Sequence, residues 1–245
     1  MQLHILSSSS VGNCYLLSNN SETLIIEAGI NLTSVKKALD YDLSKVVGCL
    51  VTHKHGDHSK YIKDFANSGI VVMALESVLE FRELKGHHRS KPITAGKGYK
   101  LGNFRVYVFE VAHDVPCVGF LISHPETGNI LFLTDTFTCE YKFDNLSTIM
   151  VEANYSDKIL EENILSGRTN FVMRKRLLYS HMELETTKRL VLNHDLTQVN
   201  NIILLHLSSE NSNANLFKKE IEEATGKVVY VADRGMKINI DEMPY

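Results

Sequence analysis

A segment of seven residues, 52–58, reads T-H-K-H-G-D-H and places three histidines and one aspartate close together. The apolar run 46–51 leads directly into it and predicts a buried strand that ends at this segment. Because side chains at alternate positions of an extended chain point the same way, His53 and His55 can bind one ion together. Neutral imidazole is a common ligand of zinc and related ions, so the pattern favours a metal site over a solvated histidine-rich loop.

The second half of the segment supplies a further pair of ligands. Asp57 and His58 follow the turn that Gly56 makes easy, so they are placed to serve a second ion a few ångströms from the first. Imidazole and carboxylate ligands serve both zinc and manganese. The segment therefore predicts two divalent metal ions without choosing between these two elements.

Three further residues of the same kinds stand where predicted strands end, namely His113, Asp135 and His206. Each of them alone would more often be a structural residue. Ligands from distant strands can, however, converge at one edge of a sheet. We therefore expect these three side chains to join the histidine-rich segment in one site.

Strand and helix patterns alternate along the chain, which predicts an α/β fold with sheets covered by helices. The predicted helices are 31–39, 60–67 with Ser59 as its N-cap, 75–85, 158–165, 172–179, 186–193 and 211–225. The predicted strands are 3–6, 14–18, 23–27, 46–51, 70–74, 104–110, 117–123, 129–133, 148–151, 201–205, 227–232 and 236–240. No linker rich in Pro, Gly or Ser interrupts them, so residues 1–245 are expected to form a single domain with two sheets face to face and helices on both outer surfaces.

Composition narrows the class of protein. With 44% apolar and 22% charged residues, the chain can bury a sizeable core and remain soluble. Its net charge of −3 lacks the general basic signature of a nucleic-acid binder, although a local patch stays open. The four cysteines form no C-x-x-C pair, which indicates free thiols in a reducing compartment. With no secretion signal and no apolar run of membrane-spanning length, we expect a cytoplasmic protein without a membrane partner.

The H-x-H-x-D-H segment, followed in order by His113, Asp135 and His206, resembles the metallo-β-lactamase superfamily. The resemblance covers nearly the whole chain. It implies an αββα sandwich of two mixed β-sheets with a dinuclear metal site at one edge. It also assigns the metal ligands: His53, His55 and His113 to one ion, Asp57, His58 and His206 to the other, and Asp135 to both. One departure is Glu27, which stands where the superfamily usually has aspartate.

A narrower resemblance concerns the loop 8–13, which reads S-S-S-V-G-N. It resembles the S-G-S-x-G-N loop of the YycJ (WalJ) type of metal-dependent hydrolase, with Ser9 in place of a glycine. The segments 111–114, 134–136 and 207–211 also resemble that group, whose relatives include tRNase Z, RNase J and cyclic-phosphate phosphodiesterases. The resemblance implies an exonuclease-like phosphodiesterase that uses a metal-bridging hydroxide. In the loop, the expected substrate contacts are Ser8, Ser10 and Asn13.

Two residues are expected to act in catalysis. Asp57 can bind the second ion and accept a hydrogen bond from the attacking hydroxide. His181 is the expected general acid for the leaving oxygen, because imidazole titrates near working pH. From spacing alone, a capping or core histidine would be an equal interpretation of His181. The segment Glu152-Ala153-Asn154, together with His181, is similar to the tRNase Z arrangement, in which a histidine outside the metal shell assists the leaving group.

The most basic stretch of the chain precedes His181 and contains Arg168, Arg174, Lys175 and Arg176. Any one of these residues would more often lie on a solvated helix face. Together they could bind the phosphates of a strand. Arg168, Lys175 and Arg176 are therefore candidate substrate contacts.

These features lead to one main hypothesis and three alternatives. The main hypothesis is a metal-dependent phosphodiesterase of the nuclease type, with DNA or RNA as substrate. The net charge of −3 keeps open a hydrolase of a small cyclic phosphate or nucleotide phosphodiester. A lactone or thioester hydrolase could use the same metals, but the basic stretch disfavours it. A non-enzymatic role is least expected, because no metal ligand is missing.

Overall fold

The computed structural model describes residues 1–168 and 171–241, without the side chains of Phe171, Val172, Met173 and Arg176. The strands are β1 Gln2–Ser9, β2 Gly12–Ser18, β3 Thr23–Ile26, β4 Val46–Leu50, β5 Val72–Leu75, β6 Ser90–Ile93, β7 Gly98–Leu101, β8 Phe104–Val111, β9 Cys117–His124, β10 Gly128–Leu133, β11 Leu146–Glu152, β12 Asn201–Leu205, β13 Val228–Val231 and β14 Lys237–Asn239. The helices are α1 Leu32–Ala38, α2 Gly56–Ser59, α3 Ile62–Asn67, α4 Glu76–Phe81, α5 Asp157–Leu165, α6 Phe171–Ser180, α7 Leu184–Leu192 and α8 Ala214–Thr225.

The strands form two seven-stranded sheets, with the orders β14-β1-β2-β3-β4-β5-β6 and β13-β12-β11-β10-β9-β8-β7. Both sheets are mixed. In the first, β3, β4, β5 and β6 run parallel and the remaining pairs are antiparallel. In the second, β10 to β13 run parallel and β7 to β10 antiparallel. The predicted pair of mixed sheets is therefore confirmed.

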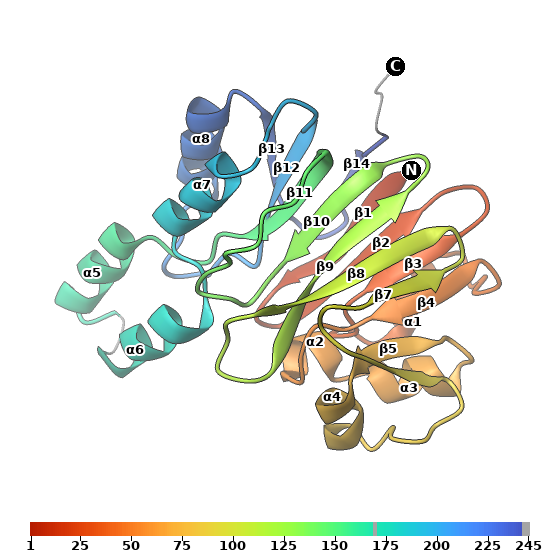
Figure 1. Cartoon of the computed structure of the whole chain (residues 1–245). Coiled ribbons are helices and arrows are strands. Elements are labelled where there is room, and N and C mark those ends of the chain that lie inside the picture. The colour runs from red at the N-terminus through yellow and green to blue at the C-terminus, as the bar shows by residue number, and fades with distance from the viewer. Residues whose placement is uncertain (169–170, 242–245) are drawn as a thin grey trace.

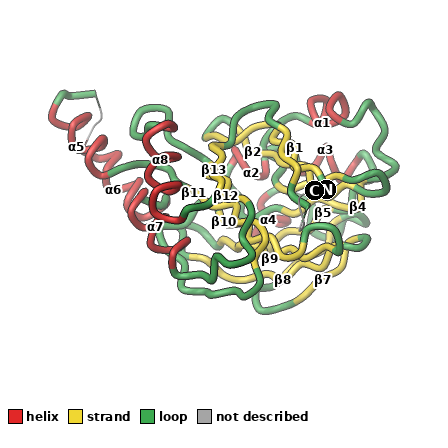
Figure 2. Tube along the Cα trace, turned by 90° about the horizontal axis from the view of Figure 1, so that it is seen from above, coloured by secondary structure: helices red, strands yellow, loops and turns green. Residues whose placement is uncertain are grey.

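Helices cover both outer faces of the sandwich (Figure 1). Helices α1 to α4 contact the first sheet, whereas α7 and α8 contact β11 and β13 of the second. Figure 2 shows that α5 and α6 project beyond the sheets at the end where α7 and α8 lie. The two sheets meet in one apolar cluster that includes Tyr15, Phe120 and Phe132, each almost fully buried. Burying one such ring stabilises the fold by about 1.5–3 kcal/mol.

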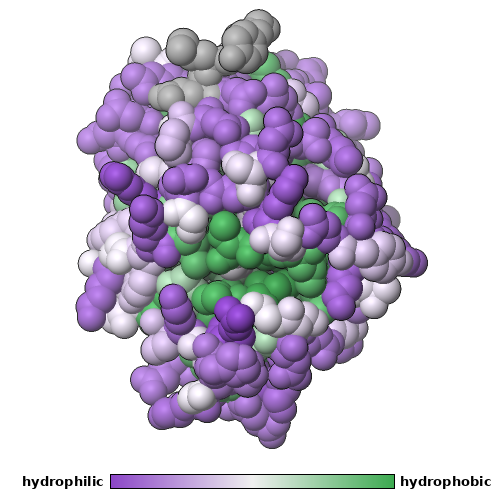
Figure 3. Space-filling model, turned by 90° about the vertical axis from the view of Figure 1, so that its right-hand side faces the viewer, coloured by the Kyte–Doolittle hydropathy of each residue, from purple (hydrophilic) through white to green (hydrophobic). Residues whose placement is uncertain are grey.

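The inter-sheet core reaches the surface at one edge. Val47, Val71 and Tyr99, which belong to the region of β4, β5 and β7, are only partly buried and pack against the inter-sheet cluster. The face of the molecule drawn in Figure 3 shows an apolar strip that is flanked by hydrophilic side chains. The Met1 amino group pairs with the Asp241 carboxylate, which holds the two described ends of the chain together. No helix in 1–168 or 171–241 is long and apolar enough to cross a membrane.

The predicted helix 60–67 with Ser59 as its cap was wrong in its first turn. The structure instead forms α2 from Gly56 and a separate α3 from Ile62. Ser59 lies inside α2, and its hydroxyl donates to the carbonyl oxygens of Lys54 and His55 at 2.8 and 3.0 Å. Asp57 and His58 therefore lie in a short helix that begins directly at the metal motif.

The strands β6 and β7 were not predicted, and the predicted helix 75–85 is longer than the observed α4. The strands β6 and β7 are short and largely exposed, so they carry no clear alternation of apolar and polar residues. The predicted helix 75–85 ends at Phe81. Glu83 has a φ of 55°, a left-handed conformation that a helix cannot continue through.

Candidate metal centre

The predicted ligands come from both sheets and meet at one edge of the sandwich. His53 follows β4 of the first sheet, whereas His113, Asp135 and His206 follow β8, β10 and β12 of the second. All of these strands except β8 belong to parallel pairs, whose carboxyl ends share an edge of the sheet. Residues that lie far apart in the sequence are therefore brought within a few ångströms of one another.

The first cluster joins His53, His55, His113 and Asp135, whose ligand atoms lie within 4.8 Å of one another. The Nδ1 atom of His55 lies 3.0 Å from Nε2 of His53 and 3.2 Å from Nε2 of His113. Oδ2 of Asp135 lies 3.7 Å from Nε2 of His53. Three imidazole nitrogens and a carboxylate oxygen thus face a common point, as binding of one divalent ion requires.

The second cluster joins Asp57, His58, Asp135 and His206, again within 4.8 Å. Oδ2 of Asp57 lies 3.2 Å from Nε2 of both His58 and His206. Oδ1 of Asp135 lies 3.3 Å from Nε2 of His58. Asp135 therefore turns one oxygen to each cluster, which is the geometry of a bridging carboxylate.

A supporting hydrogen-bond chain orients the ligand His53. The hydroxyl of Thr52 donates its proton to Oε1 of Glu27 at 2.6 Å and lies 2.9 Å from Nδ1 of His53. Because a hydroxyl has a single proton, this bond requires Nδ1–H of His53 to donate to Thr52. The lone pair of His53 then lies on Nε2 and faces the cluster, as in metal sites whose ligands are oriented by outer partners. Glu27 also lies 3.2 Å from Nδ1 of His58, so the longer side chain supports both ligand pairs.

Three residues at this edge have left-handed backbone conformations. Glu27, Asp135 and His206 have φ values of 68°, 49° and 53°, and each follows the end of a strand. Such a conformation costs a residue with a side chain about 1–2 kcal/mol. Strain of this kind is concentrated at functional sites, where the surrounding structure holds it in place.

The serine-rich loop, residues 8–13, packs against the second cluster. Most of it belongs to β1 and β2, and the chain turns at Ser10 and Val11. Ser8 accepts a hydrogen bond from the amide of His206 at 3.0 Å, and Asn13 lies 3.1 Å from Nε2 of His58. The structure thus places Ser8 and Asn13 against metal-site residues, whereas the exposed Ser10 lines an open cavity.

Arg82, which no motif singles out in the sequence, braces the histidine-rich segment. It follows α4 and donates to the carbonyl oxygen of Lys54 and to the hydroxyl of Ser59, both at 2.9 Å. The Lys54 carbonyl lies between the two ligands His53 and His55. This contact therefore holds the histidine-rich segment against the end of α4, and only the tertiary structure reveals it.

His181 lies at the edge of the second cluster and is held there by Glu152. Nδ1 of His181 lies 2.7 Å from Oε1 of Glu152, and its ring stacks on that of His206 with 5.3 Å between centroids. The same Glu152 oxygen lies 3.2 Å from Nδ1 of His206. Glu152 is fully buried and was not among the predicted site residues, although its place at the end of β11 was the available signal.

The charges around the site differ between its two sides. Burial lowers the pKa of His53 well below its usual range, so this imidazole is neutral. Burial also tends to lower the pKa of His206, but the surrounding carboxylates, Asp135 foremost, raise it to about 10. For His181, the Glu152 carboxylate likewise outweighs burial and raises the pKa. His181 therefore keeps a proton to higher pH than a free imidazole does.

The described side chains of the basic stretch do not line the two cavities that contain His181. Arg168 is exposed and donates to the hydroxyl of Ser166 at 3.0 Å, and Lys175 is exposed on α6. Arg174 pairs with Glu161 at 3.7 Å. Neither Arg168 nor Lys175 belongs to the cavities that contain His181. The side chain of Arg176 lies outside the described part of the structure.

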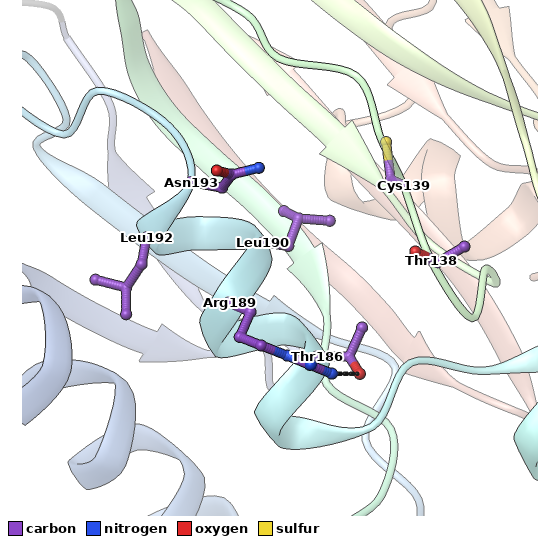
Figure 4. A pocket seen from close by; sticks show the side chains of 7 residues that line it. All are labelled: Thr138, Cys139, Thr186, Arg189, Leu190, Leu192 and Asn193. Carbon is purple, nitrogen blue, oxygen red and sulfur yellow. Dashed lines mark hydrogen bonds between the residues drawn. The ribbon is translucent and has the colours of Figure 1, made fainter.

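Two cavities adjoin His181. The first, of about 420 Å³, is lined by hydroxyl side chains, among them Ser10 and Ser208, by His206 and by the carboxylate of Glu210. The second, of about 710 Å³, contains Phe137 and Leu178 but no predicted metal ligand. A third cavity of about 560 Å³ lies between α7 and the loop at Thr138 and Cys139 (Figure 4). It adjoins the second through Arg189 and contains none of the predicted site residues.

These donors fit two divalent cations. Imidazole nitrogens and carboxylate oxygens converge in both clusters, and no lysine or arginine side chain among the described residues enters either one. We therefore expect zinc or manganese to raise the melting temperature. Saturation at ~1,000 times the dissociation constant stabilises by about 4 kcal/mol, or ~10 °C for a chain of this size. Differential scanning fluorimetry with and without a chelator measures the shift, with His88→Ala, an exposed histidine outside the site, as control. Equal melting temperatures with and without metal would contradict the assignment.

Comparison with known proteins places this site in context. Residues 9–137, slightly more than half of the chain, match the protein family described as "Metallo-beta-lactamase superfamily". The exodeoxyribonuclease YycJ of Bacillus anthracis is 25% identical over 238 residues, which cover 91% of this chain and 89% of that protein. The exodeoxyribonuclease WalJ of Streptococcus pneumoniae is 24% identical over 225 residues, with 85% and 82% covered.

Solved structures share the fold at lower identity. The metallo-beta-lactamase fold protein YhfI from Bacillus subtilis superposes with a TM-score of 0.71 at 14% identity and covers 97% of this chain and 99% of its own. The short form of human tRNase Z gives a TM-score of 0.64 at 12% identity, with 98% and 99% covered. At such identities the similarity supports the fold and carries no statement about substrate.

Proposed function

Because this chain belongs to the metallo-β-lactamase superfamily, we propose that it is a metal-dependent phosphodiesterase of the nuclease type. The observation that carries the proposal is an acid beside two ligand clusters: His181, bonded to the buried Glu152, stacks on the ligand His206. A phosphodiester needs charge neutralisation at its non-bridging oxygens and a proton for its leaving alkoxide. Both sheets supply ligands to the site, so we propose that residues 1–245 act as one domain.

Two divalent cations would supply Lewis acidity and a nucleophilic water at neutral pH. We propose that His53, His55 and His113 hold one cation and that Asp57, His58 and His206 hold the other, with Asp135 between them. Asp57 is partly exposed, with 19% of its side chain accessible. Its carboxylate can therefore accept a hydrogen bond from the attacking water and direct it toward the phosphorus.

His181 donates the proton to the leaving oxygen in this proposal. Its Nδ1–H bonds to Oε1 of Glu152, so Nε2 carries the proton that is given away. The carboxylate also stabilises the charged imidazole before the transfer. Glu152 is thus a positioning residue, and His181 is the group that touches the substrate.

The substrate class rests on similarity and on one cavity. Two relatives named exodeoxyribonucleases cover most of this chain, which favours DNA. The cavity with Ser10, Ser208 and His206 offers hydroxyl donors next to the second cluster, where a phosphate would lie. A small phosphodiester remains the second candidate, because Arg168 and Lys175 lie outside the cavities at His181.

The proposal is tested with two substrates and manganese as the added metal. We expect the wild type to remove the label progressively from a 5′-end-labelled linear DNA duplex and also to hydrolyse bis(p-nitrophenyl) phosphate. A chelator should stop both reactions. Hydrolysis of the small ester alone would favour the nucleotide-sized substrate. Absence of both reactions in metal-loaded protein would contradict the phosphodiesterase proposal.

A further inference from the structure

His181 divides the space beside the metal centre into two cavities of different chemistry. The hydroxyl-lined cavity of about 420 Å³ contains the predicted ligand His206, so it adjoins the cations and the phosphate. The cavity of about 710 Å³ also contains His181 but no predicted ligand. An acid must contact the oxygen that leaves. The group attached to that oxygen can therefore extend past His181 into the larger cavity, away from the predicted metal ligands.

The larger cavity offers an aromatic and apolar wall close to His181. Phe137, two residues after Asp135, and Leu178 of α6 line it, with 36% and 40% of their surfaces exposed. The Phe137 ring contacts that of Tyr179 edge-on, with 6.5 Å between centroids. Backbone contact from Phe137 to the Ala112 carbonyl at 3.3 Å ties this loop to the segment that carries His113. The aromatic side chain is thus held at a set distance from the site.

The charges of this cavity do not favour a phosphate as its main occupant. Its lining includes the carboxylates of Asp157, Glu183, Glu185 and Glu220, against the cations Lys158 and Arg189. Lys188 pairs with Glu185 at 2.6 Å and with Glu220 at 2.9 Å, so the surface carries no net positive charge and suits a neutral heterocycle with N–H donors better than a polyanion. A cavity of about 710 Å³ is also within the range of pockets that hold small organic groups.

We propose that this cavity binds the nucleobase of the leaving nucleoside, with Phe137 as its stacking partner. The inference rests on the proposed phosphodiesterase function and specifies its leaving-group site. It explains how an enzyme of negative net charge can select a nucleotide chain: cations hold the phosphate, and the base is recognised by its aromatic face. It also predicts that the group released is a terminal nucleoside unit rather than a long phosphate-bearing strand.

The test compares two dinucleotides of thymidine in manganese, one intact and one whose leaving residue is abasic. Their scissile ester and leaving alcohol have the same chemistry. We expect the wild type to cleave the intact dinucleotide with a kcat/KM about tenfold higher, the usual value of one stacked base. Phe137→Ala should remove this preference, leaving the abasic substrate unaffected, and Phe137→Tyr should restore it. The exposed aromatic Phe81, with 57% of its surface accessible on α4, serves as the matched control through Phe81→Ala.

Each outcome decides between the two proposals. Equal loss on both substrates in Phe137→Ala would indicate a structural role and overturn the base site, as would an unchanged preference. Phe137→Leu repeats the comparison if the alanine variant fails to fold. A wild type that hydrolyses bis(p-nitrophenyl) phosphate but shows no preference for the intact dinucleotide, or cleaves neither dinucleotide, would overturn the base site alone. A wild type inactive on all three substrates would overturn the phosphodiesterase function as well.

Discussion

Asp135→Asn protein is expected to lose bound metal and at least about 10³-fold in turnover, since cation stabilisation of the transition state is worth several kcal/mol. Asp135 turns Oδ1 toward His58 and Oδ2 toward His53, so one carboxylate serves both clusters. Neighbouring imidazoles keep its pKa well below the usual range, and it is therefore an anion at working pH. Asparagine keeps the shape but removes the charge and one ligand oxygen.

Asparagine is the better first variant because Asp135 has a φ of 49°. Asparagine tolerates this conformation, whereas alanine adds backbone strain to the loss of the ligand. Metal content by mass spectrometry and the rate on bis(p-nitrophenyl) phosphate are measured together, with the exposed Asp144→Asn as control. Full metal occupancy and wild-type turnover in Asp135→Asn would overturn the bridging role.

His181→Ala protein should keep its metals and lose about 10²- to 10⁴-fold on DNA, the usual contribution of a general acid. Nitrophenolate leaves without a proton, so the rate on bis(p-nitrophenyl) phosphate should change little. A structural role for His181 would lower both rates together. Equal losses of rate on the two substrates would therefore contradict the role of His181 as the general acid.

Glu152→Gln tests how His181 is positioned. The Glu152 carboxylate raises the pKa of His181, so the acid form persists to higher pH in the wild type. Without the negative charge the pKa of His181 falls. The alkaline limb of the pH–rate profile on DNA should therefore move to lower pH. Because Glu152 also bonds His206 at 3.2 Å, the measurement is made at saturating metal. If the alkaline limb stays at its wild-type pH, Glu152 does not control the protonation of His181.

Much of the metal centre could be predicted from the sequence. The histidine-rich segment is local and an apolar run leads into it, so this segment and two sheets face to face were expected from the residues themselves. The mixed character of both sheets was implied by the resemblance. The resemblance to a known superfamily then assigned His113, Asp135 and His206 to particular ions. The structure brings these residues into two clusters, and their assignment to particular ions stays a prediction.

Other features depend on contacts that no local pattern encodes. Glu152 and His181 are 29 residues apart, and Glu152 and His206 are 54 apart. The sequence places Glu152 at the end of a strand, but no local pattern shows that its carboxylate lies buried between two imidazoles. Its role follows from burial at the end of β11, where two imidazoles share one of its oxygens.

The sequence by itself determined which side chains can hold metal, because ligand chemistry is a property of residue type and strand ends are readable from apolar runs. Tertiary structure alone decided which oxygen faces which histidine, that Ser8 supports His206, and that Phe137 lines a cavity beside His181. The physical reason is that these contacts depend on how two sheets pack and where their loops turn. Packing of that kind is set by the whole core and is not written in any one segment.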